Sequence, residues 1–186
     1  MVLDDIFRYL RWQKAIRVIK NFPKKMVICD IGCGPSGEFL KTISSFINFG
    51  FGFDKNINFY KNSRIDLKKI DFDKKGIPLG EETVDVVTML AVLEHLENPK
   101  NILRETFRIL KTNGFLILTT PSSRAKPILD FLAKLRLINK EAISEHKKYY
   151  SLEELENLFL NTSFRKENIN LKYFEFGFNI LAIIKK

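Results

Sequence analysis

Three glycines and one carboxylate stand close together near the start of the chain. The stretch VICDIGCGPSGEFL carries Gly32, Gly34 and Gly37, and Asp30 lies two residues before the first glycine. Glycines in this G-x-G-x-x-G spacing let a backbone approach a ligand without a side chain in the way. The pattern is typical of a turn between a strand and a helix that holds a dinucleotide or another phosphate-bearing ligand.

Asp30 argues against a phosphate in this turn. A buried carboxylate two residues before Gly32 would repel a pyrophosphate, and Glu38 at the start of the following helix would add to the repulsion. The same carboxylate suits a ligand with an ammonium group and no phosphate. A nicotinamide oxidoreductase is therefore disfavoured.

Further acids follow the next two expected strands. Asp54 ends the strand predicted over residues 50–54, and Asp71 ends a weaker strand predicted over residues 64–71. Asp66 and Asp73 are the alternatives to Asp71 as the acid that borders the site. In parallel sheets, ligands bind outside the carboxyl ends of the strands. We therefore expect these acids to border the same site as Asp30.

The alternation of strands and helices predicts the fold. Apolar periodicity, glycines, prolines and caps indicate helices over residues 4–20 (with Asp4 as N-cap), 38–49, 99–113 (ended by Gly114), 128–137 and 152–160 (with a Ser151–Glu154 capping box), and strands over 26–31, 50–54, 64–71, 84–90, 115–120, 171–176 and 178–184. This order predicts one α/β domain over residues 1–186. We expect a doubly wound, mostly parallel seven-stranded sheet with an antiparallel C-terminal edge hairpin.

Composition limits the class of protein. The chain has 186 residues and a net charge of +9, from 31 basic and 22 acidic residues, and most of the basic residues are scattered lysines. We interpret them as solvated faces rather than a nucleic-acid groove. No apolar run reaches membrane-span length, and the N-terminus does not resemble a signal peptide. Two cysteines are too few for a disulfide scaffold or a zinc site, so we predict no metal and a reducing cytoplasmic setting.

Several motifs together resemble a known family. DIGCGPSG, FGFD and TVDVVTMLAVLEHLENPKNILRETFRILKTNGFLILTTPS are similar to the motifs of class I S-adenosylmethionine-dependent methyltransferases, in particular the small-molecule branch often called type 11. The resemblance covers about Met26 to Ser122, and EHKKYYSLEELENLF resembles a later stretch of the same family. It implies a Rossmann-like fold and S-adenosylmethionine as cofactor, with S-adenosylhomocysteine as product.

The resemblance also implies which residues hold the cofactor. Asp30 would hold its amino group, Asp54 both ribose hydroxyls, and Asp71 the adenine amino group. The backbone of the glycine turn would line the methionine part, and Leu90 would lie near its carboxylate or sulfonium. The full expected set is Asp30, Gly32, Cys33, Gly34, Gly37, Asp54, Lys55, Asp71, Phe72, Leu90 and Ala91.

Methyl transfer from a sulfonium is an in-line displacement that depends mainly on orientation. A base is needed only if the acceptor must lose a proton, and the two histidines, His95 and His146, are the candidates. The segment 122–150 is expected to cover the acceptor. The region 1–22 is expected to form an N-terminal helix. The absence of an N/D-P-P-Y/F loop after the strand over 84–90 argues against adenine-N6 or glutamine targets.

We therefore expect a small-molecule, lipid or sugar acceptor. Two alternatives stay open: an RNA or protein methyltransferase that uses the basic surface, and a module that binds S-adenosylmethionine without catalysis. The identity of the acceptor and the oligomeric state do not follow from these residues.

Overall fold

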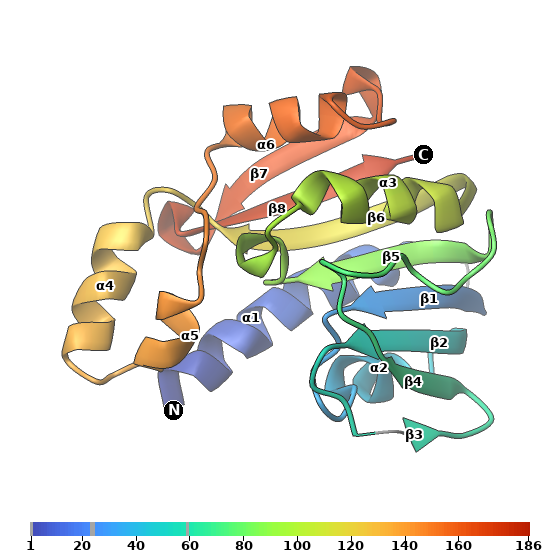
Figure 1. Cartoon of the computed structure of the whole chain (residues 1–186), viewed down its shortest axis with the longest axis horizontal. Helices are drawn as coiled ribbons and strands as arrows, with labels where there is room; N and C mark the ends of the chain where they lie inside the picture. The colour runs from blue at the N-terminus through green and yellow to red at the C-terminus, as the bar shows by residue number, and fades with distance from the viewer. Residues whose placement is uncertain (1, 23–24, 59) are drawn as a thin grey trace.

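An eight-stranded sheet forms the centre of the protein, in the order β3-β4-β2-β1-β5-β6-β8-β7 (Figure 1). The computed structural model describes residues 2–22, 25–58 and 60–186. In this order, the five neighbouring strands β4, β2, β1, β5 and β6 are parallel to one another, while β3 and β8 run antiparallel to their neighbours. The strands are β1 (Met26–Ile31), β2 (Ile47–Asp54), β3 (Tyr60–Lys61), β4 (Ile65–Lys69), β5 (Val84–Leu90), β6 (Leu110–Pro121), β7 (Ile169–Phe174) and β8 (Asn179–Lys185).

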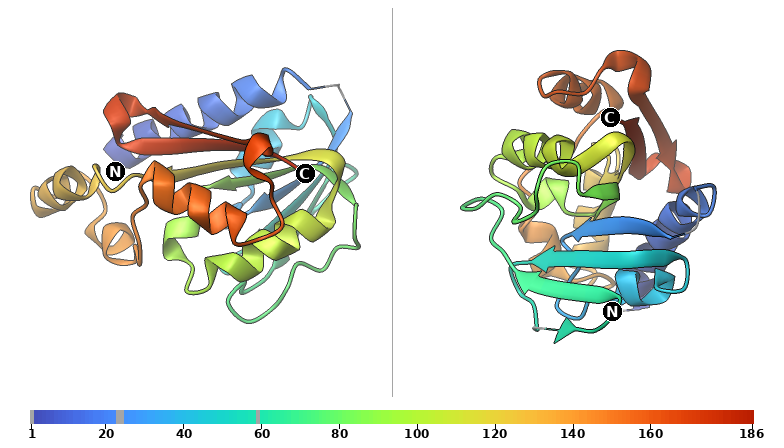
Figure 2. Two further views of the ribbon diagram at one scale, coloured as in Figure 1. Left: turned by 90° about the horizontal axis from the view of Figure 1, so that it is seen from above. Right: turned by 90° about the vertical axis from the view of Figure 1, so that its right-hand side faces the viewer.

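Helices cover both faces of this sheet (Figure 2). They are α1 (Val2–Ile19), α2 (Glu38–Ile43), α3 (Pro99–Ile109), α4 (Lys126–Lys134), α5 (Lys140–Ser144) and α6 (Leu152–Leu160), with short 3₁₀ turns η1 (Leu93–His95), η2 (Lys166–Asn168) and η3 (Glu175–Gly177). Because successive side chains of a strand point to opposite faces of the sheet, the hydrophobic core consists of two layers, one on each face. Ile28 of β1 packs in the layer of α1 and α2, and the next residue, Cys29, packs in the layer of α3 and α6.

The predicted doubly wound α/β sheet with a C-terminal antiparallel hairpin is confirmed, with one more strand than expected. The eighth strand is β3, a two-residue edge strand that pairs with β4. Among the described residues, no helix combines the length and the apolar character that a membrane span requires.

The helix expected over residues 38–49 is wrong in its second half. Helix α2 ends at Ile43, and the chain enters β2 at Ile47. Aromatic and β-branched residues favour strands, and in the stretch from Ile47 to Phe53 they outweigh the helical spacing read from the sequence.

Gly114 does not end helix α3, contrary to the prediction. The helix stops at Ile109 and β6 begins at once, with an irregularity in its pairing with β5 before Phe115. A Cβ at Gly114 would meet the backbone oxygen of Lys111 at 2.8 Å and that of Asp85 at 3.0 Å. The glycine is therefore required by close backbone approach inside the sheet.

Two helix boundaries near the carboxyl ends of the strands also differ from the expectation. Helix α1 begins at Val2, so Asp4 lies in its first turn rather than at its N-cap. The helix expected over residues 128–137 is α4, which ends at Lys134, and the short helix α5 follows it.

The predicted capping box is confirmed at the start of α6. Ser151 Oγ accepts the backbone N–H of Glu154 at 3.1 Å, and Glu154 Oε2 accepts the backbone N–H of Ser151 at 2.9 Å. The backbone N–H groups of Ser151 and Glu154 are thereby satisfied.

Replacing Ser151 by Ala should lower the free energy of unfolding by about 1 kcal/mol, because one capping acceptor is lost. Chemical denaturation monitored by circular dichroism measures the change. Ser163→Ala is the matched control, since Ser163 is an exposed serine beyond the end of α6. Equal stability of the two variants would show that the cap contributes nothing.

Candidate functional site

The strand order reverses between β1 and β5, at the centre of the sheet. From β1 the chain proceeds to β2 on one side, and from β5 it proceeds to β6 on the other. In doubly wound sheets the ligand crevice lies at this point, outside the carboxyl ends of the strands.

Asp30 is buried at this reversal point, with a residue exposure of 2%. It pairs with Thr88 across the β1–β5 ladder, and Thr88 Oγ1 donates a hydrogen bond of 2.6 Å to Asp30 Oδ1. Burial raises the pKa of Asp30 to about 7; the hydrogen bond from Thr88 opposes this rise, and the negative charge of Asp54 adds to it. A cation beside Asp30 would hold its carboxyl group in the ionised form.

The turn after β1 brings the backbone to Asp54. The N–H of Gly34 donates to Asp54 Oδ2 at 2.9 Å, and the N–H of Asn56 donates to Asp54 Oδ1 at 2.8 Å. A Cβ at Gly32 would meet Val92 Cγ2 at 2.2 Å, whereas a Cβ at Gly34 would meet none of the described residues within 4 Å. Gly32 therefore permits close packing, and Gly34 leaves its backbone open to a ligand.

A cavity of about 250 Å³ lies against this turn. Helix α1 supplies part of its wall through Arg8, Arg11 and Trp12. Six of the residues predicted to hold the cofactor line it: Asp30, Gly32, Cys33, Gly34, Leu90 and Ala91.

The other predicted residues lie outside the lining of this cavity. Gly37 is the N-cap of α2, with a φ of 62°, and a Cβ there would meet the Leu67 side chain at 2.8 Å. Lys55 is exposed directly after β2, and the partly buried side chain of Phe72 packs against the hydrophobic core. Asp54 reaches the turn through Gly34 but is not part of the cavity wall.

Asp71 follows β4 on the same edge of the sheet. Its side chain is 44% exposed and lies 3.1 Å from Lys74 Nζ, and the hydrogen bond from Lys74 is the main cause that lowers its pKa. Asp66 is buried within β4 beside Lys68, away from the carboxyl end of the strand. Asp73 accepts the backbone N–H groups of residues 97 and 98. The assignment of Asp71 to the adenine amino group stays a prediction.

A second, larger cavity of about 550 Å³ adjoins the first. Arg8, Arg11 and Ala91 border both cavities. Ala91 has a φ of 59°, a conformation uncommon for a residue other than glycine, and such residues cluster at functional sites. Contents of the two cavities would therefore face each other where Arg8, Arg11 and Ala91 lie.

The wall of the larger cavity is mostly apolar. Helix α1, the segment 122–150 and the turn before β8 supply these side chains, which are Phe7, Leu10, Ile128, Leu129, Leu132, Ile138, Ile143, Phe176 and Phe178. A contact of Asp4 Oδ2 with the backbone N–H of Asn139, at 3.2 Å, joins α1 to the start of α5.

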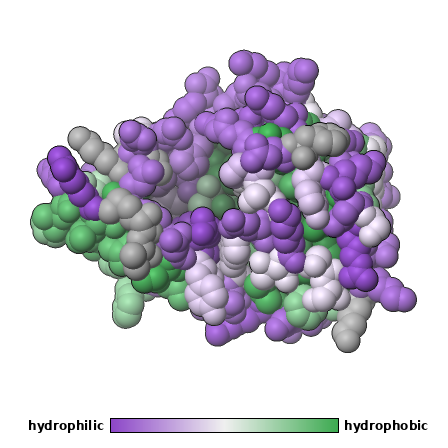
Figure 3. Space-filling view, turned by 90° about the horizontal axis from the view of Figure 1, so that it is seen from below, coloured by the Kyte–Doolittle hydropathy of each residue, from purple (hydrophilic) through white to green (hydrophobic). Residues whose placement is uncertain are grey.

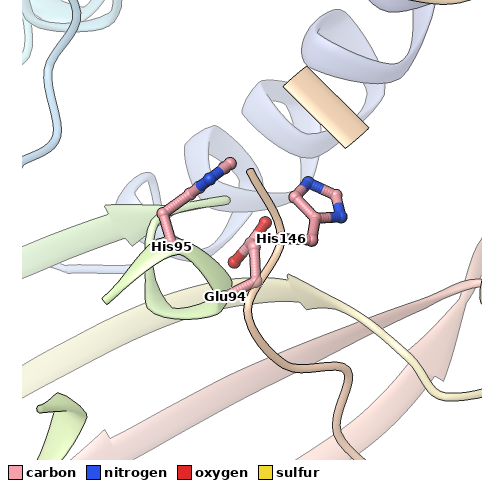
Figure 4. Close-up of side chains that lie close together, drawn as sticks. All are labelled: Glu94, His95 and His146. Carbon is pink, nitrogen blue, oxygen red and sulfur yellow. The ribbon is translucent and has the colours of Figure 1, made fainter. Parts of the chain in front are cut away.

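One end of the larger cavity is polar and carries Glu94, His95 and His146 (Figure 4). The imidazole rings of the two histidines meet edge to face, with centroids 4.8 Å apart. His146 Nδ1 lies 3.0 Å from the Tyr149 hydroxyl, and Thr120 Oγ1 donates to Glu94 Oε2 at 3.1 Å. Figure 4 shows the carboxylate of Glu94 beside the two rings.

Burial shifts the pKa of all three groups toward their neutral forms. It raises the pKa of Glu94 to about 7, lowers the pKa of His95, and lowers the pKa of His146 to about 4. His95 Nδ1 is buried and has no hydrogen-bond partner among the described residues. Near neutral pH, Glu94 is the member of the cluster best suited to take a proton.

The cluster also offers a donor set that metals accept. One ligand atom from each of Glu94, His95 and His146 lies within 4.8 Å of the others, and a carboxylate with two imidazoles binds transition metals in many proteins. The positive charge of Arg11 acts on the same carboxylate and opposes a cation there. The absence of a metal site therefore stays a prediction.

Sequence reasoning did not single out Arg11 or Glu94. Arg11 borders both cavities, and its pKa is lowered by burial and raised by the charges of Glu94 and Glu175. A signal for Glu94 was present in its position next to His95. No signal existed for Arg11, because helical periodicity does not show which residue of α1 faces the crevice.

Comparison with known proteins gives the family. Residues 5–168 match the Methyltransferase domain family. Demethylmenaquinone methyltransferase of Chlamydia felis is 33% identical over 135 residues, which cover 63% of this chain and 57% of that protein. Ribosomal RNA-processing protein 8 of Mus musculus is 28% identical over 141 residues, covering 73% of this chain and 28% of that protein. The chain thus spans about half or less of these two relatives.

A solved structure gives the same fold. The crystal structure of a SAM-dependent methyltransferase from Archaeoglobus fulgidus superposes with a TM-score of 0.73 at 19% identity, covering 100% of this chain and 98% of that one. The match of most of the chain to one domain family, with the sheet order and the glycine turn described above, agrees with the family resemblance seen in the motifs. The chain belongs to the Methyltransferase domain family.

Proposed function

We propose that this protein is an S-adenosylmethionine-dependent methyltransferase that acts on a small, largely apolar acceptor with a polar group to be methylated. The observation that carries the proposal is the meeting of two cavities at Ala91. One cavity borders the buried carboxylate of Asp30, and the other is apolar with a polar end at Glu94. A donor in the first and an acceptor in the second would face each other at Ala91.

The residues of the smaller cavity fit the methionine end of this cofactor. Asp30 needs a nearby cation to stay ionised, and an ammonium group supplies one. The open backbone at Gly34 leaves room for the methionine chain. The cofactor contributes a methyl group on a sulfonium, which is already activated for transfer.

The residues of the neighbouring strand ends fit the rest of the cofactor. Each oxygen of Asp54 already accepts one backbone N–H and keeps capacity to accept a ribose hydroxyl. Asp71, with Phe72 beside it and Lys55 on the next strand end, remains our assignment for the adenine side.

The larger cavity positions the acceptor. Its apolar wall orients the body of the molecule, and orientation is the main requirement of in-line methyl transfer. Among the groups at the polar end, Glu94 takes the acceptor's proton, because its pKa is close to neutral pH, whereas burial lowers the pKa of His95 and lowers that of His146 to about 4. His95 and His146, the candidates from the sequence, hold the acceptor group by hydrogen bonds.

An RNA acceptor is the second candidate. The net charge of +9 and the similarity to a ribosomal RNA-processing protein support it. The apolar side chains of the larger cavity favour a small molecule with an apolar body over a nucleotide, which has little apolar surface to bury against them.

Calorimetric titration with S-adenosylmethionine, S-adenosylhomocysteine and NAD tests the cofactor assignment. Binding of the first two without binding of NAD is expected. A transfer assay with a labelled methyl group then compares phenolic and isoprenoid lipids, sugars and total RNA as acceptors. Binding of NAD alone would overturn the proposal, and labelling of RNA alone would replace the small-molecule acceptor.

The affinity for S-adenosylmethionine should increase with pH, because the ligand's ammonium group needs Asp30 in its ionised form. With a pKa of about 7 for Asp30, affinity should rise by roughly tenfold from about pH 6 to about pH 8. Asp30→Asn should bind more weakly and lose this dependence. Adenosine, which lacks the ammonium group, is the control ligand, and an equal pH dependence for adenosine would contradict the assignment.

Asp54→Ala should weaken S-adenosylmethionine binding by about 1.5–3 kcal/mol, the scale of hydrogen bonds to a charged group. The same titration measures the loss. Glu167→Ala, which removes an exposed carboxylate in η2, is the matched control. Unchanged affinity of the Asp54 variant would remove this residue from the site.

Glu94→Gln should reduce the turnover number by about a hundredfold or more, the usual contribution of a general base, with cofactor affinity unchanged. In the wild-type protein, turnover should rise with pH through about 7, as the carboxyl group of Glu94 loses its proton. The labelled-methyl assay with the identified acceptor gives both results. A profile that persists in Glu94→Gln but disappears in His95→Gln would move the base to His95.

A further inference from the structure

Helix α4 is apolar on two sides. Ile128, Phe131 and Leu135, spaced three and four residues apart, are 40%, 59% and 53% exposed and share one outer face. Leu129 and Leu132, together with Ile128, line the larger cavity. A helix that is apolar beyond the face turned to its own core is typically covered by a second partner.

The exposed apolar side chains extend past this helix. Figure 3 shows hydrophobic side chains gathered at the end of the molecule where α4 lies. Leu137, three residues beyond the end of α4, is 44% exposed. Phe176, which also lines the larger cavity, is fully exposed. We call Ile128, Phe131, Leu135 and Leu137 the outer stripe.

Basic residues flank the outer stripe at both ends. Arg124 and Lys126 precede it, and Lys134 and Arg136 stand at its other end, against one acid, Asp130. Asp130 is neutralised by Lys126 at 2.8 Å. Within the part of the chain that the structure describes, neither Lys134 nor Arg136 takes part in an ion pair closer than 4 Å.

We propose that the outer stripe docks on an anionic membrane surface, with α4 lying in the interface and its basic ends on lipid head groups. Exposed aromatic and leucine side chains bordered by lysine and arginine are the chemistry of an interfacial helix. A second copy of this chain fits less well, because it would bring another +9 charge to a basic face.

Docking here would place the membrane beside the larger cavity. Ile128 belongs both to the outer stripe and to the cavity wall, so one short helix separates the two. An acceptor with an apolar body would then pass from the bilayer to Ala91 without crossing water. Delivery of an acceptor from the bilayer rests on the proposed function. Membrane binding itself needs neither cofactor nor acceptor, so membrane binding and methyl transfer are tested separately.

Co-sedimentation with vesicles tests the proposal. Wild-type protein should bind vesicles of equal parts phosphatidylglycerol and phosphatidylcholine, bind pure phosphatidylcholine far more weakly, and be released by salt. Phe131→Ser should lower the partition coefficient by roughly tenfold. Leu160→Ser is the matched control, because Leu160 is an exposed leucine on α6, far along the chain from the outer stripe.

A pair of charge variants separates local from general electrostatics. Lys134→Gln with Arg136→Gln should reduce binding by about tenfold or more, whereas Lys100→Gln with Lys172→Gln removes the same charge elsewhere and should change it little. Circular dichroism and S-adenosylmethionine affinity show that each variant is folded. Equal binding of both pairs, no binding to anionic vesicles, or a dimer in sedimentation equilibrium that Phe131→Ser dissociates would overturn the proposal.

Discussion

Placing the carboxyl group of Asp30 inside the protein costs free energy, and one hydrogen bond from Thr88 offsets only part of that cost. The folded protein holds this proton more tightly than the unfolded chain does, because burial raises the pKa to about 7. Stability is therefore lost as pH rises from the unfolded pKa toward the folded one. The protein keeps this group at the reversal point of the sheet, where its ionised form can face a ligand cation.

Glu94, at the larger cavity, is a buried carboxylate in the same electrostatic situation as Asp30. Glu94 also has a pKa raised to about 7 by burial, and its nearest opposing influences include the charge of Arg11 and a hydrogen bond from Thr120. Burial lowers the pKa of Arg11, and the negative charges of Glu94 and Glu175 oppose that change. One arginine from the N-terminal helix thus balances the acids of the larger cavity while it borders the smaller one, so the two halves of the site are electrostatically linked.

Much of the fold and part of the site could be predicted from the sequence. Strands β1 and β5 were predicted at their observed bounds, because buried parallel strands are continuous apolar runs. The predicted element boundaries were wrong where helical spacing in the sequence competes with strand pairing in the sheet, as between α2 and β2. The boundary at Gly114 was wrong because that glycine serves a close backbone approach and not the end of a helix. The glycine turn and the acids that follow β2 and β4 could be predicted as site candidates because their positions in the sheet follow from topology, and their roles stay predictions. Arg11 could not be found, since its role depends on how α1 packs across the sheet.

The walls of the larger cavity come largely from segments outside the parallel strands: α1, α4, α5 and the turn before β8. Asp30 and Asp54, by contrast, are paired within the parallel ladders of the sheet, and the N–H of Gly34 donates to the side chain of Asp54. Substitutions at Leu129 or Ile143 would therefore reshape the larger cavity while the ladder beside the smaller cavity stays intact. Under the proposed function, such a division allows a lineage to change its acceptor over evolutionary time without rebuilding the half of the protein assigned to the donor.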